Sequence, residues 1–326
     1  MYRVADYGAL IADTVRMGAF VTALKRTIKP GAIVIDVGTG TGIFALIACA
    51  LGARRVYAIE PNDAIDVARE IAAANGYADR IEFHHARSTD VTLPERGEVL
   101  IADIGGMLPW FERAIPSIVD ARRRLLAPDG VILPRRDTIW TAVVDAAEMY
   151  SRLTRGWEAN EFGIDMSAAR DLVVNAWARG RISEDQLLAP PRRCAGVDYA
   201  NIDDPDVEMN VEWVIARAGV GHGVAAGFDR TVVEGVEISN APDAPAHVRP
   251  TLVYEPVFFP WPRPLVLEAG DVVSLELRAS LLHDEYVWAW KTQARRGNGE
   301  TKGVFNQSTF LGTPLSLERF RRQARQ

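Results

Sequence analysis

Cysteine is nearly absent from this sequence of 326 residues, which contains only Cys49 and Cys194. Two thiols cannot form a disulfide framework, and they cannot supply the four ligands of a cysteine-based zinc site. We therefore expect two reduced, structural cysteines and no metal centre.

The sequence also lacks a long apolar run and a surplus of positive charge. Its most apolar run, residues 43–51, is far shorter than the ~20 residues of a membrane span, and the first ten residues do not resemble a signal peptide. The net charge of −6 disfavours nucleic-acid binding, because phosphate binding needs excess Lys and Arg, but it is compatible with a cationic substrate. We expect a cytoplasmic protein that binds neither nucleic acid nor membrane.

The first 136 residues alternate between predicted strands and helices. Residues 1–29 have helical apolar spacing, and the β-branched run from Ala32 to Gly38 predicts a strand that is buried on both faces. Further short apolar strands are predicted at residues 55–60, 81–86, 99–103 and 131–134, with helical stretches between them. This alternation predicts a parallel α/β sheet in a first domain, residues 1–136.

The pattern changes after Arg136. Apolar and polar residues alternate along residues 207–213, 273–278 and 286–291, which predicts strands with one buried face. Several such strands separated by turn residues are typical of an antiparallel barrel or sandwich. We expect a second domain, residues 137–326, with helix-like polar stretches at about residues 151–195.

A glycine-rich motif, D-V-G-T-G-T-G, connects the first strand to a helix and places Gly38, Gly40 and Gly42 in the turn. Glycine lets the backbone approach a ligand at a helix N-terminus. A dinucleotide fingerprint would place the third glycine one residue later. Asp36 suits a cationic amino group, and Glu60, at the end of the next strand, can accept hydrogen bonds from ribose hydroxyls. The combination predicts S-adenosylmethionine and disfavours NAD.

Residues 34–60, which contain this motif, resemble the nucleotide-binding half of protein arginine methyltransferases. The resemblance continues through four later segments: residues 79–94, 122–140, 162–171 and 256–280. It implies a divergent, bacterial-type member of the family. The fold would be a Rossmann-like class I methyltransferase domain, then an antiparallel β-barrel with a helical dimerisation arm inserted at about residues 151–195. The implied assembly is a head-to-tail homodimer.

The resemblance also implies further cofactor contacts. Arg16 falls at the arginine that pairs with the methionine carboxylate of the cofactor, a role that suits a guanidinium. Tyr7 falls where the family often has a cofactor-contacting histidine. Ser88 and Thr89 fall at the adenine-binding segment; Thr89 replaces a glutamate, so we expect only a backbone or hydroxyl contact there.

The loop after the strand at residues 99–103 reads A-D-I-G-G-M-L-P-W-F-E and ends at Glu112. In the family, two glutamates of this loop hold the substrate guanidinium, since two carboxylates can fix a planar cation and localise its charge away from the attacking nitrogen. Glu112 matches the second glutamate, and Asp103 replaces the first with one methylene fewer. The resemblance therefore implies Asp103 and Glu112 as the catalytic pair for direct methyl displacement.

Two further departures from the family concern the acceptor. The Thr-His-Trp loop falls near residues 250–253, where Thr251 is kept but Leu252 and Val253 replace the other two residues. Gly105 and Gly106 stand where the family has larger residues. The cofactor side is nearly intact, so we expect an acceptor that is not the usual protein arginine or is held differently.

These observations predict an S-adenosylmethionine-dependent N-methyltransferase that acts on a guanidino nitrogen. The acceptor would be arginine in a peptide, free arginine or a guanidino metabolite, and the product would be S-adenosylhomocysteine. The alternative is a small-molecule O- or N-methyltransferase on the same fold, since the histidine is missing. A non-catalytic cofactor-binding scaffold is disfavoured because the donor loop and both acidic positions persist. The sequence does not choose among the acceptors.

Overall fold

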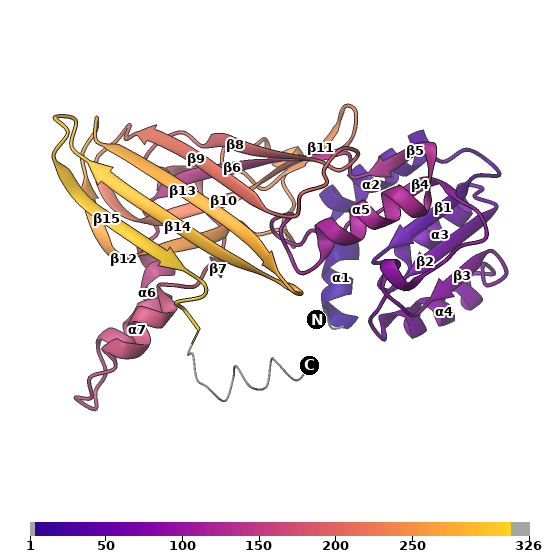
Figure 1. The fold of residues 1–326 in the computed structure, drawn as a ribbon, viewed down its shortest axis with the longest axis horizontal. Coiled ribbons are helices and arrows are strands. Elements are labelled where there is room, and N and C mark those ends of the chain that lie inside the picture. The colour runs from indigo at the N-terminus through magenta and orange to yellow at the C-terminus, as the bar shows by residue number, and fades with distance from the viewer. Residues whose placement is uncertain (1–3, 314–326) are drawn as a thin grey trace. The chain divides into compact units, whose positions relative to one another are not determined.

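The computed structural model describes residues 4–313, which divide into two compact units (Figure 1). The first unit runs to Ile139 and includes Ala195–Pro205 and Phe228–Tyr254, and the second contains the rest. The boundary expected after Arg136 lies near the first change of unit, but two later segments return to the first unit. The assignment of residues 1–136 and 137–326 as separate domains therefore stays a prediction.

The first unit contains a five-stranded parallel sheet in the order β3-β2-β1-β4-β5. The strands are β1 (Ile33–Val37), β2 (Arg55–Ile59), β3 (Ile81–His84), β4 (Gly97–Ile101) and β5 (Leu126–Leu133). Four of the five residues of β1 are buried, as expected of a strand covered on both faces. The predicted Rossmann-like parallel sheet is confirmed.

Helices connect these strands: α3 (Ile43–Ala50), α4 (Ala64–Ala74) and α5 (Ala114–Arg124). From β1, the strands β2 and β3 are added on one side, and β4 and β5 are added on the opposite side. Right-handed crossovers therefore place α3 and α4 on one face of the sheet and α5 on the other. The reversal lies between β1 and β4, which is where ligands bind in open α/β sheets.

The helical segment expected at residues 1–29 is two helices, α1 (Val4–Ala12) and α2 (Thr14–Thr27). They meet at Asp13, whose side chain caps α2 by accepting a hydrogen bond from the Arg16 amide. The unit also includes β11 (Val236–Ser239), which packs against α2, and the 3₁₀ turns η1 (Ser88–Asp90) and η3 (Ala246–Val248).

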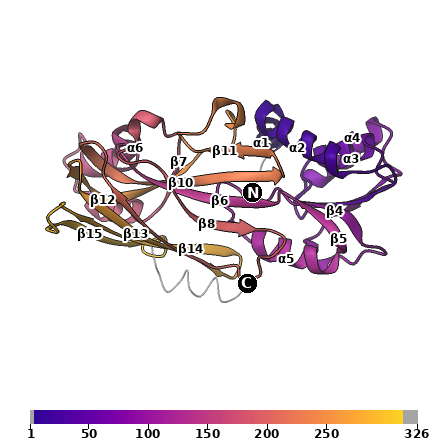
Figure 2. The same cartoon turned by 90° about the horizontal axis from the view of Figure 1, so that it is seen from above.

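The second half of the chain forms antiparallel sheets, as predicted. One has the order β7-β12-β10-β6-β8, and Figure 2 shows its strands β10, β6 and β8 side by side; the other has the order β15-β14-β13-β9. The strands are β6 (Arg136–Val144), β7 (Ala178–Arg179), β8 (Arg192–Asp198), β9 (Val207–Val214), β10 (Gly219–Val233), β12 (Val257–Leu267), β13 (Val272–Leu282), β14 (Glu285–Arg295) and β15 (Thr301–Ser308). Closure into a barrel stays a prediction.

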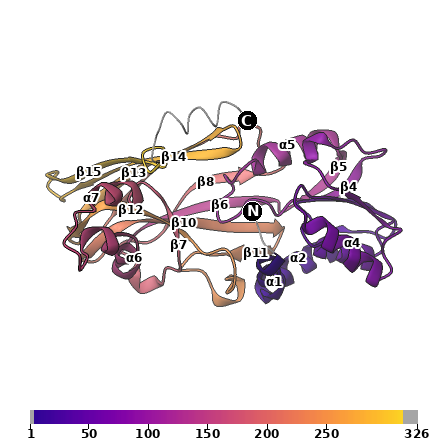
Figure 3. The same ribbon diagram turned by 90° about the horizontal axis from the view of Figure 1, so that it is seen from below.

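Period-2 burial is confirmed along β9 and β13: Met209 and Trp213 are buried, and so are Val273, Leu275 and Leu277. The predicted arm contains α6 (Ala147–Glu158), α7 (Ser167–Val173) and the turn η2 (Glu184–Gln186), and Figure 3 shows α6 and α7 as neighbours. Across residues 4–313, no helix combines the length and apolar character that a bilayer span requires.

Candidate active site

The candidate site lies at the carboxyl ends of β1, β2 and β4, beside the reversal of strand order. Asp36 pairs with Ile101 in the sheet, which brings the start of the glycine motif next to the end of β4. Glu60 follows β2, and Asp103 follows β4. Residues predicted from separate motifs therefore meet at one edge of the sheet.

The glycine motif forms a turn that side chains would block. Gly38, Gly40 and Gly42 all have positive φ, at 73°, 53° and 85°. A Cβ atom on Gly40 would lie 2.3 Å from the Tyr7 ring, and one on Gly38 would lie 2.2 Å from the Ile104 side chain. The Tyr7 and Ile104 side chains therefore pack directly against the backbone of the turn, an approach that only glycine permits at these positions. Tyr7 lies against this turn, as its predicted role requires.

Two buried carboxylates flank the turn. The Thr39 hydroxyl donates to Asp36 Oδ2 at 2.6 Å, and Glu60 accepts from the Gly40 amide at 2.9 Å. Burial raises the pKa of Asp36 to about 7, and burial also raises the pKa of Glu60. A cation beside such a carboxyl favours its ionised form. Asp36 is therefore suited to a positively charged ligand group, and Glu60 keeps lone pairs that hydroxyl donors can use.

Ser88 and Thr89 lie in η1 after β3, but their side chains differ. Ser88 is buried, and its hydroxyl has no hydrogen-bond partner among residues 4–313. Thr89 is exposed and bonds to Asp90. Arg124 of α5 holds this segment by donating to the Ser88 and Val91 carbonyl oxygens at 2.7 and 2.9 Å. The sequence analysis missed Arg124, although its i,i+4 pairing with Asp120 was readable.

Arg16 and Asp103 form a buried ion pair. Arg16 donates to Asp103 Oδ2 from Nε at 3.1 Å and from Nη2 at 2.7 Å. Both side chains are 5% exposed. Burial would lower the pKa of Arg16, but Tyr254 and Asp103 raise it. Burial would raise the pKa of Asp103, but Arg16 and Arg230 lower it. Both groups are therefore charged.

Glu112 differs sharply from Asp103, its predicted catalytic partner. Its side chain is exposed, and no other group in residues 4–313 forms a hydrogen bond or ion pair with it. Its backbone has φ +44°, a left-handed conformation that costs a non-glycine residue roughly 1–3 kcal/mol. Burial is the largest cause of the raised pKa of Glu60, and the negative charge of Glu112 is a smaller one. The Glu112 carboxylate therefore lies within electrostatic range of Glu60.

The loop at the predicted Thr-His-Trp position is fixed through its backbone. Asp13 Oδ2 accepts from the Thr251 amide at 2.7 Å and from the Leu252 amide at 2.8 Å. The same carboxylate caps α2 through Oδ1 at 3.0 Å from the Arg16 amide. Asp13 thus ties the Arg16 helix to the loop although the family's histidine is absent.

Sequence reasoning missed the residues that surround Asp103. Arg230 Nη1 donates to Asp103 Oδ1 at 2.6 Å, and the Tyr254 hydroxyl donates to Oδ2. Asp137 accepts two hydrogen bonds from Arg230 and one from the Tyr199 hydroxyl. The one available signal was a lone arginine in the largely apolar strand β10.

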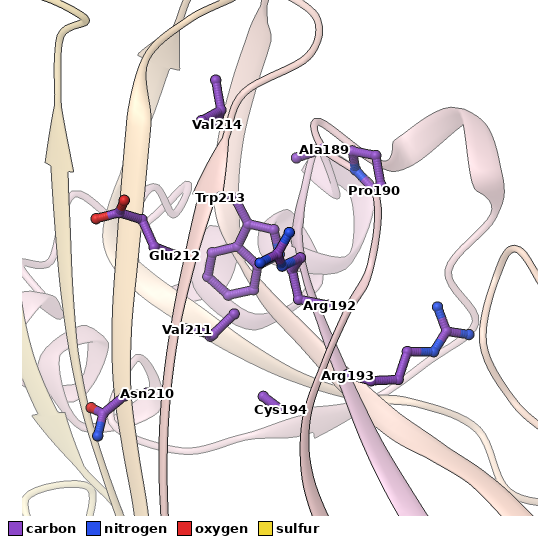
Figure 4. A pocket seen from close by; sticks show the side chains of 10 residues that line it. All are labelled: Ala189, Pro190, Arg192, Arg193, Cys194, Asn210, Val211, Glu212, Trp213 and Val214. Atoms are coloured by element: carbon purple, nitrogen blue, oxygen red, sulfur yellow. The ribbon is translucent and has the colours of Figure 1, made fainter.

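A groove of about 560 Å³ lies elsewhere, in the second unit between β8 and β9 (Figure 4). Arg192, Glu212 and Trp213 are among its lining residues, and none of the predicted site residues is. No cluster of three or more potential metal ligands occurs within residues 4–313.

The first half of the chain is similar to a known methyltransferase family. A family model described as ribosomal protein L11 methyltransferase (PrmA) matches residues 14–141. This range ends where the parallel sheet gives way to the antiparallel half, and it contains the glycine motif and the loop with Asp103 and Glu112. The match indicates a methyltransferase donor half, and it does not extend to the second half of the chain.

Curated relatives extend the similarity further. The chain is 35% identical over 256 residues to probable protein arginine N-methyltransferase 6 of Arabidopsis thaliana, covering 74% of this chain and 56% of that protein. It is 29% identical over 266 residues to protein arginine N-methyltransferase 6 of Xenopus tropicalis, covering 77% and 78%. The chain is a homologue of the protein arginine N-methyltransferases. The resemblance to this family is confirmed, and the chain spans only about half the length of the plant relatives. A divergent, bacterial-type member with a changed Thr-His-Trp loop stays a prediction.

Solved structures agree on the fold. Protein arginine methyltransferase 10 of Arabidopsis thaliana, described as having a uniquely open conformation, superposes with a TM-score of 0.79 at 22% identity, covering 94% of this chain and 97% of that one. The Trypanosoma brucei PRMT1 enzyme–prozyme heterotetrameric complex with AdoHcy gives 0.81 at 19% identity, covering 93% and 97%. The predicted arrangement of a Rossmann-like half followed by an antiparallel half is therefore confirmed.

The double role of Asp13 predicts a large stability loss when its carboxylate is removed. Asp13→Ala deletes the cap of α2 and the acceptor of two loop amides, and we expect the free energy of unfolding to fall by about 2–4 kcal/mol in chemical denaturation. Asp66→Ala is the control: it removes an exposed partner of Arg69 and should cost less than about 1 kcal/mol. Equal losses in the two variants would contradict the structural role of Asp13.

Proposed function

We propose that this protein is an S-adenosylmethionine-dependent N-methyltransferase that acts on a guanidino nitrogen of arginine. The observation that carries the proposal is the exposed Glu112 carboxylate, which has a left-handed backbone and no hydrogen-bond or ion-pair partner within residues 4–313. Its charge contributes to the raised pKa of Glu60, the carboxylate that accepts from the Gly40 amide of the glycine turn. Two findings support it: the relatives are named arginine N-methyltransferases, and two of the structural neighbours are complexes with AdoHcy or SAH.

The donor-side residues fit this cofactor. Gly38, Gly40 and Gly42 would accommodate its amino-acid part against bare backbone, and Asp36 would accept from its amino group. Glu60 would accept from the ribose hydroxyls, and the unpartnered Ser88 hydroxyl would bond to the adenine. Thr89 is exposed, so its contribution would be a backbone contact, and Tyr7 would cover the turn. When bound, S-adenosylmethionine supplies an electrophilic methyl group on a sulfonium.

Arg16 is the donor-side residue whose proposed role is most constrained. Its Nε and Nη2 atoms bind Asp103, and its Nη1 atom donates to the Leu10 carbonyl oxygen. These hydrogen bonds fix the position of the Arg16 guanidinium near the proposed cofactor site. We propose that its positive charge attracts the cofactor's carboxylate.

On the acceptor side, Glu112 would bind a guanidinium and draw its positive charge toward the bonded nitrogens. The remaining nitrogen then keeps a usable lone pair, which forms the new N–C bond as the S–C bond breaks and its electron pair returns to sulfur. The methylated guanidinium keeps its positive charge after releasing one N–H proton to solvent. Catalysis of this kind depends on orientation and fixed charges.

We further propose a homodimer through the predicted arm. The segment between α6 and α7 exposes Phe162 (81%), Ile164 (58%) and Met166 (37%). Apolar side chains gathered on one loop are typical of an interaction surface. The arm's role and a cytoplasmic location remain predictions.

The raised pKa of Asp36 predicts proton release when the cofactor binds. With its pKa raised to about 7, the Asp36 carboxyl exchanges a proton near neutral pH, whereas binding of a cationic amino group favours the ionised form. Binding of S-adenosylhomocysteine near pH 7 should therefore release protons, and its affinity should fall as the pH drops through this range. Calorimetry in buffers of different ionisation enthalpy measures this release, and undiminished release by Asp36→Asn would refute the assignment.

The exposed carboxylate of Glu112 predicts a specific loss of methyl transfer. Glu112→Gln keeps the size and backbone of the residue but removes the charge that polarises the acceptor. We expect kcat to fall by at least about 100-fold with labelled S-adenosylmethionine and arginine-containing peptides or free arginine, while S-adenosylhomocysteine affinity changes little.

Glu70→Gln provides the matched control, because Glu70 is an exposed glutamate of α4 without a partner among residues 4–313. It should retain full activity. If Glu112→Gln turns over as fast as Glu70→Gln, Glu112 does not bind the acceptor. If no guanidino acceptor is methylated by the unaltered protein, the proposed acceptor class is wrong.

A further inference from the structure

Four charged side chains form a buried charge cluster: Arg16, Asp103, Arg230 and Asp137. Arg16 and Asp103 are 5% exposed, and Arg230 and Asp137 are at most 1% exposed. The two carboxylates and two guanidinium groups balance in charge. All four residues belong to the first compact unit.

Within this cluster, the buried carboxylate of Asp103 already accepts from three internal side chains. Its Oδ2 atom accepts from Arg16 Nε, Arg16 Nη2 and the Tyr254 hydroxyl, and its Oδ1 atom accepts from Arg230 Nη1 at 2.6 Å. An ionised carboxylate offers about two lone-pair positions on each oxygen, so Oδ2 is fully occupied and Oδ1 keeps one position. The Asp103 side chain is only 5% exposed, and Arg230 already donates to Oδ1, so a substrate guanidinium could bind Asp103 through two hydrogen bonds only by displacing an internal one.

Arg230 is not free to be displaced. It donates to Asp137 from Nε at 2.8 Å and from Nη2 at 2.7 Å, which is the two-bond fork typical of arginine and carboxylate. Its guanidinium also lies 4.5 Å from the Phe228 ring centre and 5.6 Å from that of Tyr254. Removing a buried charge from such partners is strongly unfavourable.

The loop after β4 lies directly against this arginine. A Cβ atom on Gly105 would lie 3.5 Å from Arg230 Nη2, which is an ordinary van der Waals contact, and 3.3 Å from the Pro109 Cα, which is a tight one. A side chain at position 105 would therefore fill the space beside the Arg230 guanidinium and would need a small shift of the loop backbone.

We propose that Arg230 is an internal guanidinium that occupies Asp103 and thereby sets acceptor specificity: the substrate cation is held by Glu112 and not by Asp103. This inference rests on the proposed guanidino methyltransferase function. Asp103 is then a positioning residue, which fixes Arg16 and Arg230, and Glu112 is the carboxylate that touches the acceptor.

The test is a set of variants read by acceptor affinity. Calorimetry with Nα-acetyl-arginine amide, in saturating S-adenosylhomocysteine, compares Asp103→Asn in two backgrounds: the unaltered chain and Arg230→Gln/Asp137→Asn. The double substitution removes Arg230 and its counter-charge together, so it leaves no net buried charge. It also releases Asp103 Oδ1 for a ligand.

We expect Asp103→Asn to leave the affinity for the probe within about twofold in the unaltered background and to weaken it about tenfold in the double-variant background. A merely structural role for Asp103 would not produce this dependence on Arg230. A tenfold weakening in both backgrounds would overturn the proposal, because Asp103 would then bind the acceptor despite Arg230. No effect in either background would overturn it as well.

A second measurement does not depend on the proposed function. Arg230→Ala leaves a guanidinium-shaped space at Asp103 and Asp137, and guanidinium chloride at low concentration should raise its melting temperature relative to equal sodium chloride. The unaltered chain should not respond. If Nα-acetyl-arginine amide binds to no variant, the proposed acceptor class is wrong, and the melting-temperature measurement alone tests the role of Arg230. A rise that is specific to guanidinium supports an internal guanidinium site at Asp103. No such rise overturns the proposal.

Discussion

Charge balance in the buried charge cluster constrains the whole first unit. A buried carboxylate without a cation, or a guanidinium without an acceptor, costs several kcal/mol, so each member requires the others. Arg16 comes from α2, Asp103 follows β4, and Arg230 comes from β10. This requirement explains why the segments Ala195–Pro205 and Phe228–Tyr254 pack with the parallel sheet although they lie far along the chain. Their Tyr199, Arg230 and Tyr254 side chains complete the network.

The donor edge could be predicted from the sequence because it depends on local order. Gly38, Gly40 and Gly42 lie within seven residues of Asp36, and positive φ at each follows from the turn that they must form. Glu60 was predicted from its place at the end of the next strand along the chain, where a carboxylate can accept from ribose hydroxyls. The glycine spacing and strand pattern thus fixed both the fold of the first half and the position of its ligand edge.

The acceptor edge could not be predicted in the same way, because its interactions join distant residues. Asp103 bonds to residues 87, 127 and 151 positions away, and no periodicity in the sequence reports such pairs. The resemblance placed Asp103 and Glu112 in equivalent catalytic positions. The structure separates them: the Asp103 carboxylate is buried among internal donors, whereas the Glu112 carboxylate is exposed and has no hydrogen-bond or ion-pair partner within residues 4–313. A sequence motif predicts the position of a carboxylate in the fold. Whether that carboxylate can bind a substrate depends on its hydrogen-bond partners, which the motif does not show.

The difference between Asp103 and Glu112 is relevant to how methyltransferases that share a cofactor-binding fold select different methyl acceptors. Residues 14–141 match a family model for ribosomal protein L11 methyltransferase, while the longer alignments match arginine N-methyltransferases. A donor half shared between such families cannot by itself select the acceptor. Selection must come from charges placed at the loop after β4 and from the later segments that neutralise some of them. Arg16 and Arg230 both pair with Asp103, and no cation in residues 4–313 pairs with Glu112. The strained backbone at Glu112 persists in spite of its cost, which is expected where a fold holds a charge in place for a ligand.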